Sequence, residues 1–136
     1  LNIAQADGKG HAIAEVCVDN EFSWNVFLDC DFVIYAAAHD SRDGSDVVYV
    51  HKPLDREFIY SADPKDVTMI RLFDDKGNID TKAHKQLQNL LSQGYHGLDY
   101  NRNTRFMLLA KCVGTVPLAR PHQAPPQPDN DNKGPT

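Results

Sequence analysis

The chain has 136 residues, which is the usual length of a single domain. Hydrophobic residues make up 41% of it and charged residues 24%, values close to those of ordinary globular proteins, so a disordered or fibrous chain is not expected. With 14 Lys and Arg against 19 Asp and Glu, the formal net charge is -5, which argues against a large phosphate-binding surface and therefore against nucleic acid as a partner.

Alternating apolar residues predict strands in the first third of the chain. Residues 12–18 alternate with the period of a half-buried strand, and Asp19-Asn20 then supplies a turn. From Phe22 to Leu28 the even positions are Phe, Trp, Val and Leu while most odd positions are polar, so this stretch is predicted to be a further strand. Residues 32–38 are apolar on both parities, which is typical of a strand covered on both faces.

Turn residues divide the middle of the chain into two predicted hairpins. The loop "HDSRDGSD" contains Asp43-Gly44, and Gly takes the positive φ of a tight turn, so residues 47–51 are expected to return as a strand. Residues 56–61 and 67–73 are predicted to form another hairpin, with Pro64 in the turn between them.

The stretch "IDTKAHKQLQNLLSQG" predicts the one helix of the domain, with Asp80 as the residue that caps its first turn. His84 is expected at the boundary of its apolar stripe. The residues of that stripe are Ala83, Leu87, Leu90 and Leu91. The polar, glycine-bearing segment "YHGLDYNRN" is predicted to be a link, and residues 104–113 the last strand of the sheet.

The composition changes at Pro117: from this residue onward the chain contains six of its eight prolines and almost no bulky apolar residues. We therefore expect one globular β-rich domain over residues 1–115 and an extended or disordered Pro-rich tail over residues 116–136. Such a tail is also a candidate arm for a neighbouring subunit or for a proline-binding groove. The predicted fold is α+β: a mainly antiparallel curved sheet or partial barrel of six to seven strands with one helix near the C-terminus.

The three cysteines, Cys17, Cys30 and Cys112, are far apart, and an odd number cannot all pair within one chain. Cys30 and Cys112 share the parity of apolar neighbours, so both are expected to be reduced and buried. No apolar run approaches the roughly 18 residues of a membrane helix. These features favour a cytoplasmic protein without a membrane partner.

Asp29 and Asp31 are a candidate metal-binding pair. On a regular strand both carboxylates would project from one face with Cα atoms about 6.5–7 Å apart, close enough to share a divalent cation. Glu21, Ser23 and Asn25 have the same parity, however, so the two aspartates also fit a polar stripe that faces solvent. The period-two pattern favours the second interpretation.

His39 and His51 flank the first predicted hairpin and are the candidate acid and base residues of an enzyme, if the two side chains approach each other. Arg102 and Arg105 form a local basic spot that could bind one phosphate or carboxylate, or only face solvent. The aspartates of "HDSRDGSD" lack the spacing of a calcium loop and are predicted to belong to a turn.

Two functions are left open by these patterns. The favoured one is a non-catalytic binding or assembly protein, such as an accessory subunit, adaptor or inhibitor, that binds a protein partner or associates with itself and needs no cofactor. The alternative is a small metal-dependent enzyme acting on a phosphate-bearing or carbohydrate substrate. In that enzyme Asp29 and Asp31 would bind a divalent cation, and His39 and His51 would be catalytic.

Overall fold

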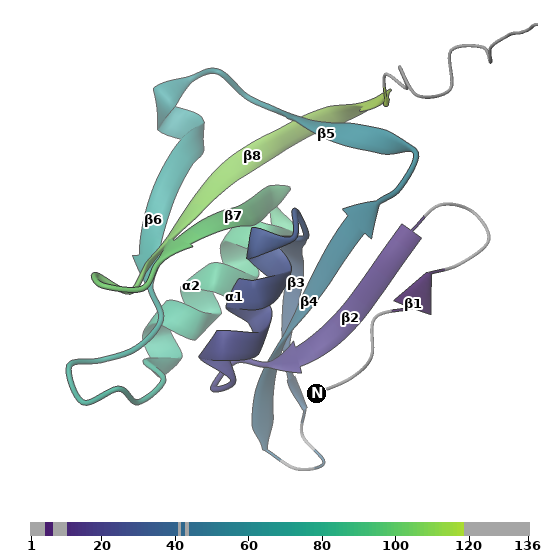
Figure 1. Ribbon diagram of the computed structural model, residues 1–136. Helices are drawn as coiled ribbons and strands as arrows, with labels where there is room; N and C mark the ends of the chain where they lie inside the picture. The colour runs from purple at the N-terminus through teal and green to yellow at the C-terminus, as the bar shows by residue number, and fades with distance from the viewer. Residues whose placement is uncertain (1–4, 7–10, 41, 43, 119–136) are drawn as a thin grey trace, which may run out of the picture.

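The structure, a computed structural model, describes residues 5–6, 11–40, 42 and 44–118. In these residues it has two α-helices, eight strands and one 3-10 turn, η1 (Figure 1). In chain order the elements are β1 (Gln5–Ala6), β2 (His11–Cys17), α1 (Glu21–Asp29), β3 (Val33–Asp40), β4 (Ser45–Pro53), β5 (Arg56–Tyr60), η1 (Pro64–Asp66), β6 (Val67–Arg71), α2 (Thr81–Ser92), β7 (Tyr95–Asn101) and β8 (Phe106–Pro117). The predicted tail lies outside the described residues from residue 119 onward.

All strand pairs are antiparallel, and the sheet has the order β1-β2-β4-β3-β7-β8-β5, with β6 also paired to β8. The sheet is not closed, because β1 at one end and β5 and β6 at the other do not pair within the described part of the chain. The predicted hairpin of β3 and β4 is confirmed, and Gly44 in its turn has a φ of 76°. The predicted hairpin of β5 and β6 is wrong: both strands pair with β8 instead.

The predicted α+β class with an antiparallel sheet is confirmed, but the elements differ in two places. Residues 22–28, predicted to be a strand, belong to helix α1, so the expectation of a single helix is wrong. Residues 95–101, predicted to be a link, form strand β7. The sheet has seven strands of five or more residues, and six to seven were expected. The number agrees only because one predicted strand is a helix while one predicted link is a strand.

Helix α1 forms because its apolar residues also fit a helical period. Trp24 and Leu28, four positions apart, are buried, whereas Phe22 and Val26 are exposed. The side chain of Asn20 caps the first turn by accepting from the backbone N–H of Ser23 at 3.4 Å. The helix ends before Asp31, which has a φ of 68°.

Both helices contribute to one buried core. Trp24 and Leu28 of α1 and Leu87 and Leu91 of α2 belong to the same cluster as side chains from strands at both ends of the sheet. The sheet therefore curves around the two helices, as Figure 1 shows. The stretch that predicted a helix contains α2, and Asp80 caps it as expected by accepting from the backbone N–H groups of residues 82 and 83.

Strand β7 lies between β3 and β8 and needs a residue without a side chain at Gly97. A Cβ atom there would lie 3.0 Å from Met107 Sδ and 3.1 Å from Ile34 Cβ, both in fully buried side chains. Gly97, one reason why this segment was predicted to be a link, thus allows β3 and β8 to approach β7 closely.

Two further expectations can be compared with the structure. All three cysteines are free, but Cys30 is exposed and Cys112 only half-buried, so the predicted burial of Cys30 is wrong. Neither helix in the described ranges is long and apolar enough to cross a lipid bilayer.

Candidate functional site

The end of helix α1 separates the predicted metal-binding pair. Asp29 is the last residue of the helix, and Asp31 follows it in a left-handed conformation, so the strand geometry expected for the pair is wrong. Asp29 Oδ2 lies 3.2 Å from Arg102 Nη2, and both side chains are exposed. Among the described residues, no group of three or more His, Cys, Asp or Glu side chains is arranged to hold a metal ion.

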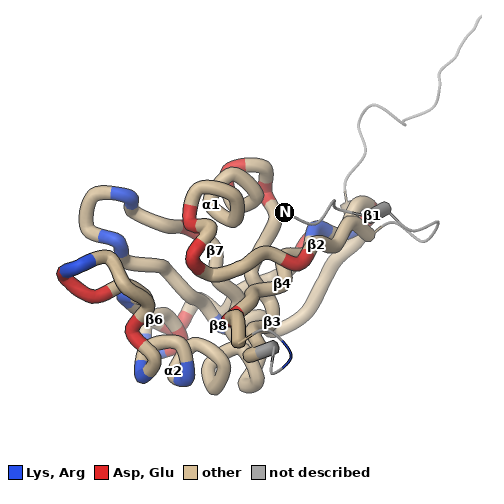
Figure 2. The backbone as a smooth tube through the Cα atoms, turned by 90° about the horizontal axis from the view of Figure 1, so that it is seen from below, with Lys and Arg blue, Asp and Glu red and all other residues tan. Residues whose placement is uncertain are grey.

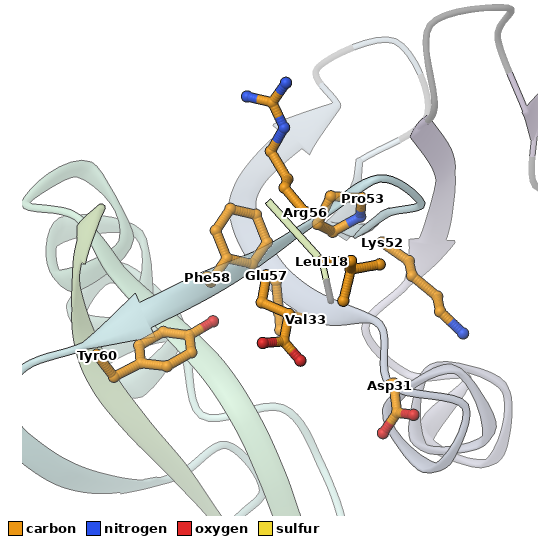
Figure 3. Close-up of a pocket in the computed structure, with 9 residues that line it drawn as sticks. All are labelled: Asp31, Val33, Lys52, Pro53, Arg56, Glu57, Phe58, Tyr60 and Leu118. Atoms are coloured by element: carbon orange, nitrogen blue, oxygen red, sulfur yellow. The ribbon is translucent and has the colours of Figure 1, made fainter. Parts of the chain in front are cut away.

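Asp31 lines a cavity of about 380 Å³ beside β5 (Figure 3). In Figure 3 the guanidinium group of Arg56 points away from Asp31, and Tyr60 lies at the other end of the cavity. The ammonium group of Lys52 donates to the backbone oxygen of Cys30 at 3.1 Å. The charged groups do not converge on one point, so this cavity offers apolar contact rather than a catalytic arrangement. Its described lining is Asp31, Val33, Lys52, Pro53, Arg56, Glu57, Phe58, Tyr60 and Leu118.

His39 and His51 do not come together, so their expected approach is wrong. In the register of the hairpin His39 is opposite Asp46, and His51 is opposite Val33. Six residue positions along β3 separate these two pairs, a distance of about 20 Å. Asp46 and His51 also differ in parity along β4, which places the two pairs on opposite faces of the sheet.

His39 instead belongs to a cluster with Asp46 and His84. Its Nδ1 atom lies 2.7 Å from Asp46 Oδ1, and the same oxygen lies 3.6 Å from Nε2 of His84. The side chain of His39 is largely exposed, whereas that of His84 is only 4% exposed. Neither ring nitrogen of His84 has a hydrogen-bond partner in the part of the chain that the structure describes.

These three residues line a cavity of about 330 Å³ between the β3–β4 hairpin and the first half of α2, which we call the His84 pocket. All of its described lining residues have polar side chains: His39, Asp46, Thr81, His84, Lys85 and Gln88. The sequence contains a signal for the burial of His84. The residue lies three positions before Leu87 and seven before Leu91, which is the helical spacing of the buried stripe.

A second histidine group lies on the face of the sheet opposite the helices. His51 Nε2 is 2.8 Å from His11 Nδ1. The ring of Phe58 on β5 contacts His51 at 5.6 Å and His96 at 4.7 Å between ring centroids. The hydroxyl group of Tyr60 is 2.9 Å from Nδ1 of His96. Sequence reasoning missed this group, since its members come from four strands.

The environment of His96 and Tyr60 keeps these two side chains uncharged at neutral pH. Burial lowers the pKa of His96 to about 4, and nearby His51 lowers it further in the same direction. Burial also raises the pKa of Tyr60, and the electrostatic interaction with Cys112 raises it further. A neutral imidazole can accept the hydrogen bond that the protonated Tyr60 hydroxyl donates. The group therefore fixes β5 against the sheet by aromatic packing.

The basic spot of Arg102 and Arg105 faces helix α1, with which it lines a cavity of about 200 Å³. Arg102 is paired with Asp29, and Arg105 Nη2 lies 3.5 Å from Glu21 Oε1. The hydroxyl group of Tyr100 donates to Glu21, and the pKa of Tyr100 is raised, first by burial and then by that carboxylate. Both arginines thus hold the turn between β7 and β8 to α1.

Comparison of the chain with protein-family models, with curated proteins and with solved structures gave no match.

Proposed function

We propose that this protein is a non-catalytic binding or assembly protein, whose protein partner or second copy docks on the outer face of strands β6 and β8. The observation that carries the proposal is a group of exposed apolar side chains there. Met69 is 58% exposed, Val67 41% and Phe106 38%. Isolated exposed apolar residues are ordinary, but a contiguous group on one face is typical of an interaction site.

The pairing of the two strands places these residues on one face. Met69 is opposite Leu108, and the buried pair of Ile70 and Met107 comes between Met69 and Phe106 in the register. Because neighbouring residues of a strand point to opposite faces, Val67, Met69, Phe106 and Leu108 share the face away from the helices. We call these four residues the outer patch.

The outer patch also borders an edge of the sheet. Strand β6 pairs with β8 on one side and has no strand partner on its other side among the described residues. An edge strand beside apolar side chains offers a partner both backbone hydrogen bonds and apolar contact, as in binding by strand addition. This arrangement supports a protein partner more directly than a small-molecule ligand.

A charged substitution in the outer patch tests the proposal. Met69→Glu is expected to abolish association, because it places a carboxylate in an interface that excludes water. Self-association is measured by sedimentation velocity over a wide concentration range. Partner binding is measured by quantitative mass spectrometry of the proteins that the full chain captures from its source cell.

Phe22→Glu is the matched control, since Phe22 on α1 is 73% exposed and is not a member of the outer patch. Retention of the same assembly or partner by Phe22→Glu and its loss in Met69→Glu would support the proposal. The proposal fails if Met69→Glu keeps every association of the original chain.

The alternative of a metal-dependent enzyme stays a prediction from the sequence, because no observation in the described residues favours it over binding. We keep the cytoplasm as the proposed compartment, which agrees with three free cysteines, two of them exposed.

A further inference from the structure

The His84 pocket has a feature that packing alone does not explain. A buried polar atom without a hydrogen bond destabilises a fold, and such atoms are uncommon in proteins. His84 has two of them and lines a cavity of about 330 Å³, where the nearest carboxylate oxygen, Oδ1 of Asp46, is 3.6 Å from its Nε2. An apolar side chain would fill the same place on α2 at lower cost, so the imidazole is better explained by a ligand.

The charges around the pocket favour an anion. Asp46 is the one acidic side chain among the described lining residues, and its Oδ1 atom is already in contact with the imidazole of His39. Lys85 has no ion pair among the residues that the structure describes. The ammonium group of Lys85 is therefore left to pair with a ligand, and an anion is the ligand that it fits.

The charged side chains within helix α2 are all basic. It contains Lys82 and Lys85 but no acidic residue, whereas α1 contains Glu21 and Asp29 and no basic one, a difference visible in Figure 2. The carboxylate of Asp80 caps the first turn of α2, so the side chains of the helix, rather than its free amides, face the pocket. Thr81 lies one turn before Lys85, and Gln88 lies one turn after His84. Both side chains therefore supply further hydrogen-bond donors along the same side of the helix.

From these observations we propose that the His84 pocket binds the oxyanion group of a small molecule, a phosphate or a carboxylate. Lys85 and Thr81 hold the anionic oxygens, and His84 donates to one of them the hydrogen bond that it otherwise lacks. His39, which is exposed and oriented by Asp46, lies at the rim beside the rest of the ligand. The volume of the cavity exceeds that of a single phosphate ion, which leaves room for the group that carries it.

Titration calorimetry of the full chain at constant ionic strength tests the proposal, with inorganic phosphate in one series and citrate in the other. We expect saturable binding of at least one anion. Lys85→Gln is expected to weaken it about tenfold or more, because a charge-assisted hydrogen bond is lost. His84→Leu is expected to weaken it as well. The anion that binds distinguishes a phosphate ligand from a carboxylate ligand.

Lys82→Gln is the matched control, since it removes the same charge from the same helix outside the lining of the pocket. It should leave the affinity nearly unchanged. In nitrogen-resolved NMR spectra of the imidazole rings, the bound anion should shift the signals of His84 and not those of His96.

Three results would overturn the proposal. The first is the absence of saturable binding with both anions. The second is an equal loss of affinity in Lys82→Gln and Lys85→Gln, which would indicate attraction to the charge of the helix as a whole. The third is saturable binding of Zn²⁺ in a chain that binds neither anion, which would make the pocket a metal site.

Discussion

Two histidines in this protein, His84 buried and His96 half-buried, have different surroundings. His96 forms a hydrogen bond with Tyr60 and packs against Phe58, and burial keeps it uncharged. His84 is buried more deeply, yet both of its ring nitrogens lack a hydrogen bond within the described residues. The imidazole of His96 therefore stabilises the fold, whereas that of His84 destabilises it.

Replacing His84 should therefore make the protein more stable. In His84→Leu a side chain of similar size removes two unsatisfied atoms, and we expect the free energy of unfolding to rise by about 1 kcal/mol. The melting temperature should rise by about 3–5 °C in a domain of this size. Both are measured by thermal and urea unfolding followed by circular dichroism.

Gln88→Leu is the control, since it introduces the same side chain on the same helix and at the same pocket without relieving a buried nitrogen. It should change the stability by less than about 0.5 kcal/mol. A loss of stability in His84→Leu would mean that the imidazole has a bonding partner in solution.

Part of the candidate site at this scale can be predicted from the sequence. Asp43-Gly44 predicts the turn, although a two-residue turn there would place His39 opposite Val48; the observed pairing of Asp40 with Ser45 brings His39 opposite Asp46 instead. The hairpin also keeps His39 and His51 apart, because His39 lies near the turn and His51 lies near the far end of β4. The approach of His84 could not be predicted, since it depends on where α2 crosses the sheet.

Helix α1 illustrates how one apolar pattern can fit two kinds of element. Residues 22, 24, 26 and 28 alternate as in a strand, but only 24 and 28, which are one helical turn apart, are buried. The helix is favoured by the cap at Asn20, and by Trp24, whose Nε1 donates to the backbone oxygen of Val18 at 2.8 Å. Asp29 and Asp31 consequently mark the end of a helix rather than one face of a strand.

The cap of α1 can be tested by substitution. Asn20→Ala removes the side chain that accepts from the backbone of Ser23 and should lower the free energy of unfolding by about 1 kcal/mol. Asn20→Asp keeps an acceptor in the same place and should have little effect. Urea unfolding of the three chains measures both changes. Equal stability of Asn20→Ala and the original chain would show that the cap contributes nothing.

At the scale of the whole molecule, the two faces of the sheet have different chemistry. The face under the helices is made of aliphatic residues such as Val48, Val50 and Leu109. The opposite face, where β5 packs, has histidines and aromatic rings. The side chains of β5 are therefore held by groups that acid can charge.

Acid should accordingly destabilise the protein. The pKa of His96 is about 4 in the folded state, against an ordinary value of 6.5, so the unfolded chain binds the proton more readily. As the pH falls from 6.5 to 4, the free energy of unfolding should decrease. The decrease attributable to His96 should be about 1–2 kcal/mol, since the ring is only partly buried and solvent reduces the effect.

Urea titrations at pH 7 and pH 4.5 measure this decrease. His96→Gln should reduce the difference in the free energy of unfolding between the two pH values. His39→Gln, which removes an exposed imidazole, should not reduce it. An unchanged pH dependence in His96→Gln would contradict the assignment.

Several local elements of this protein follow from its sequence: strands β2 to β6 and β8, the β3–β4 hairpin, and helix α2 with its cap at Asp80 and its apolar stripe. These depend on residues close together in the chain, and their periods and turn residues are visible in it. Packing of the folded chain, in contrast, makes residues 22–28 a helix, pairs β5 and β6 with β8, and brings His84 to Asp46. Burial and strand pairing depend on partners distant in the sequence, which no local pattern specifies.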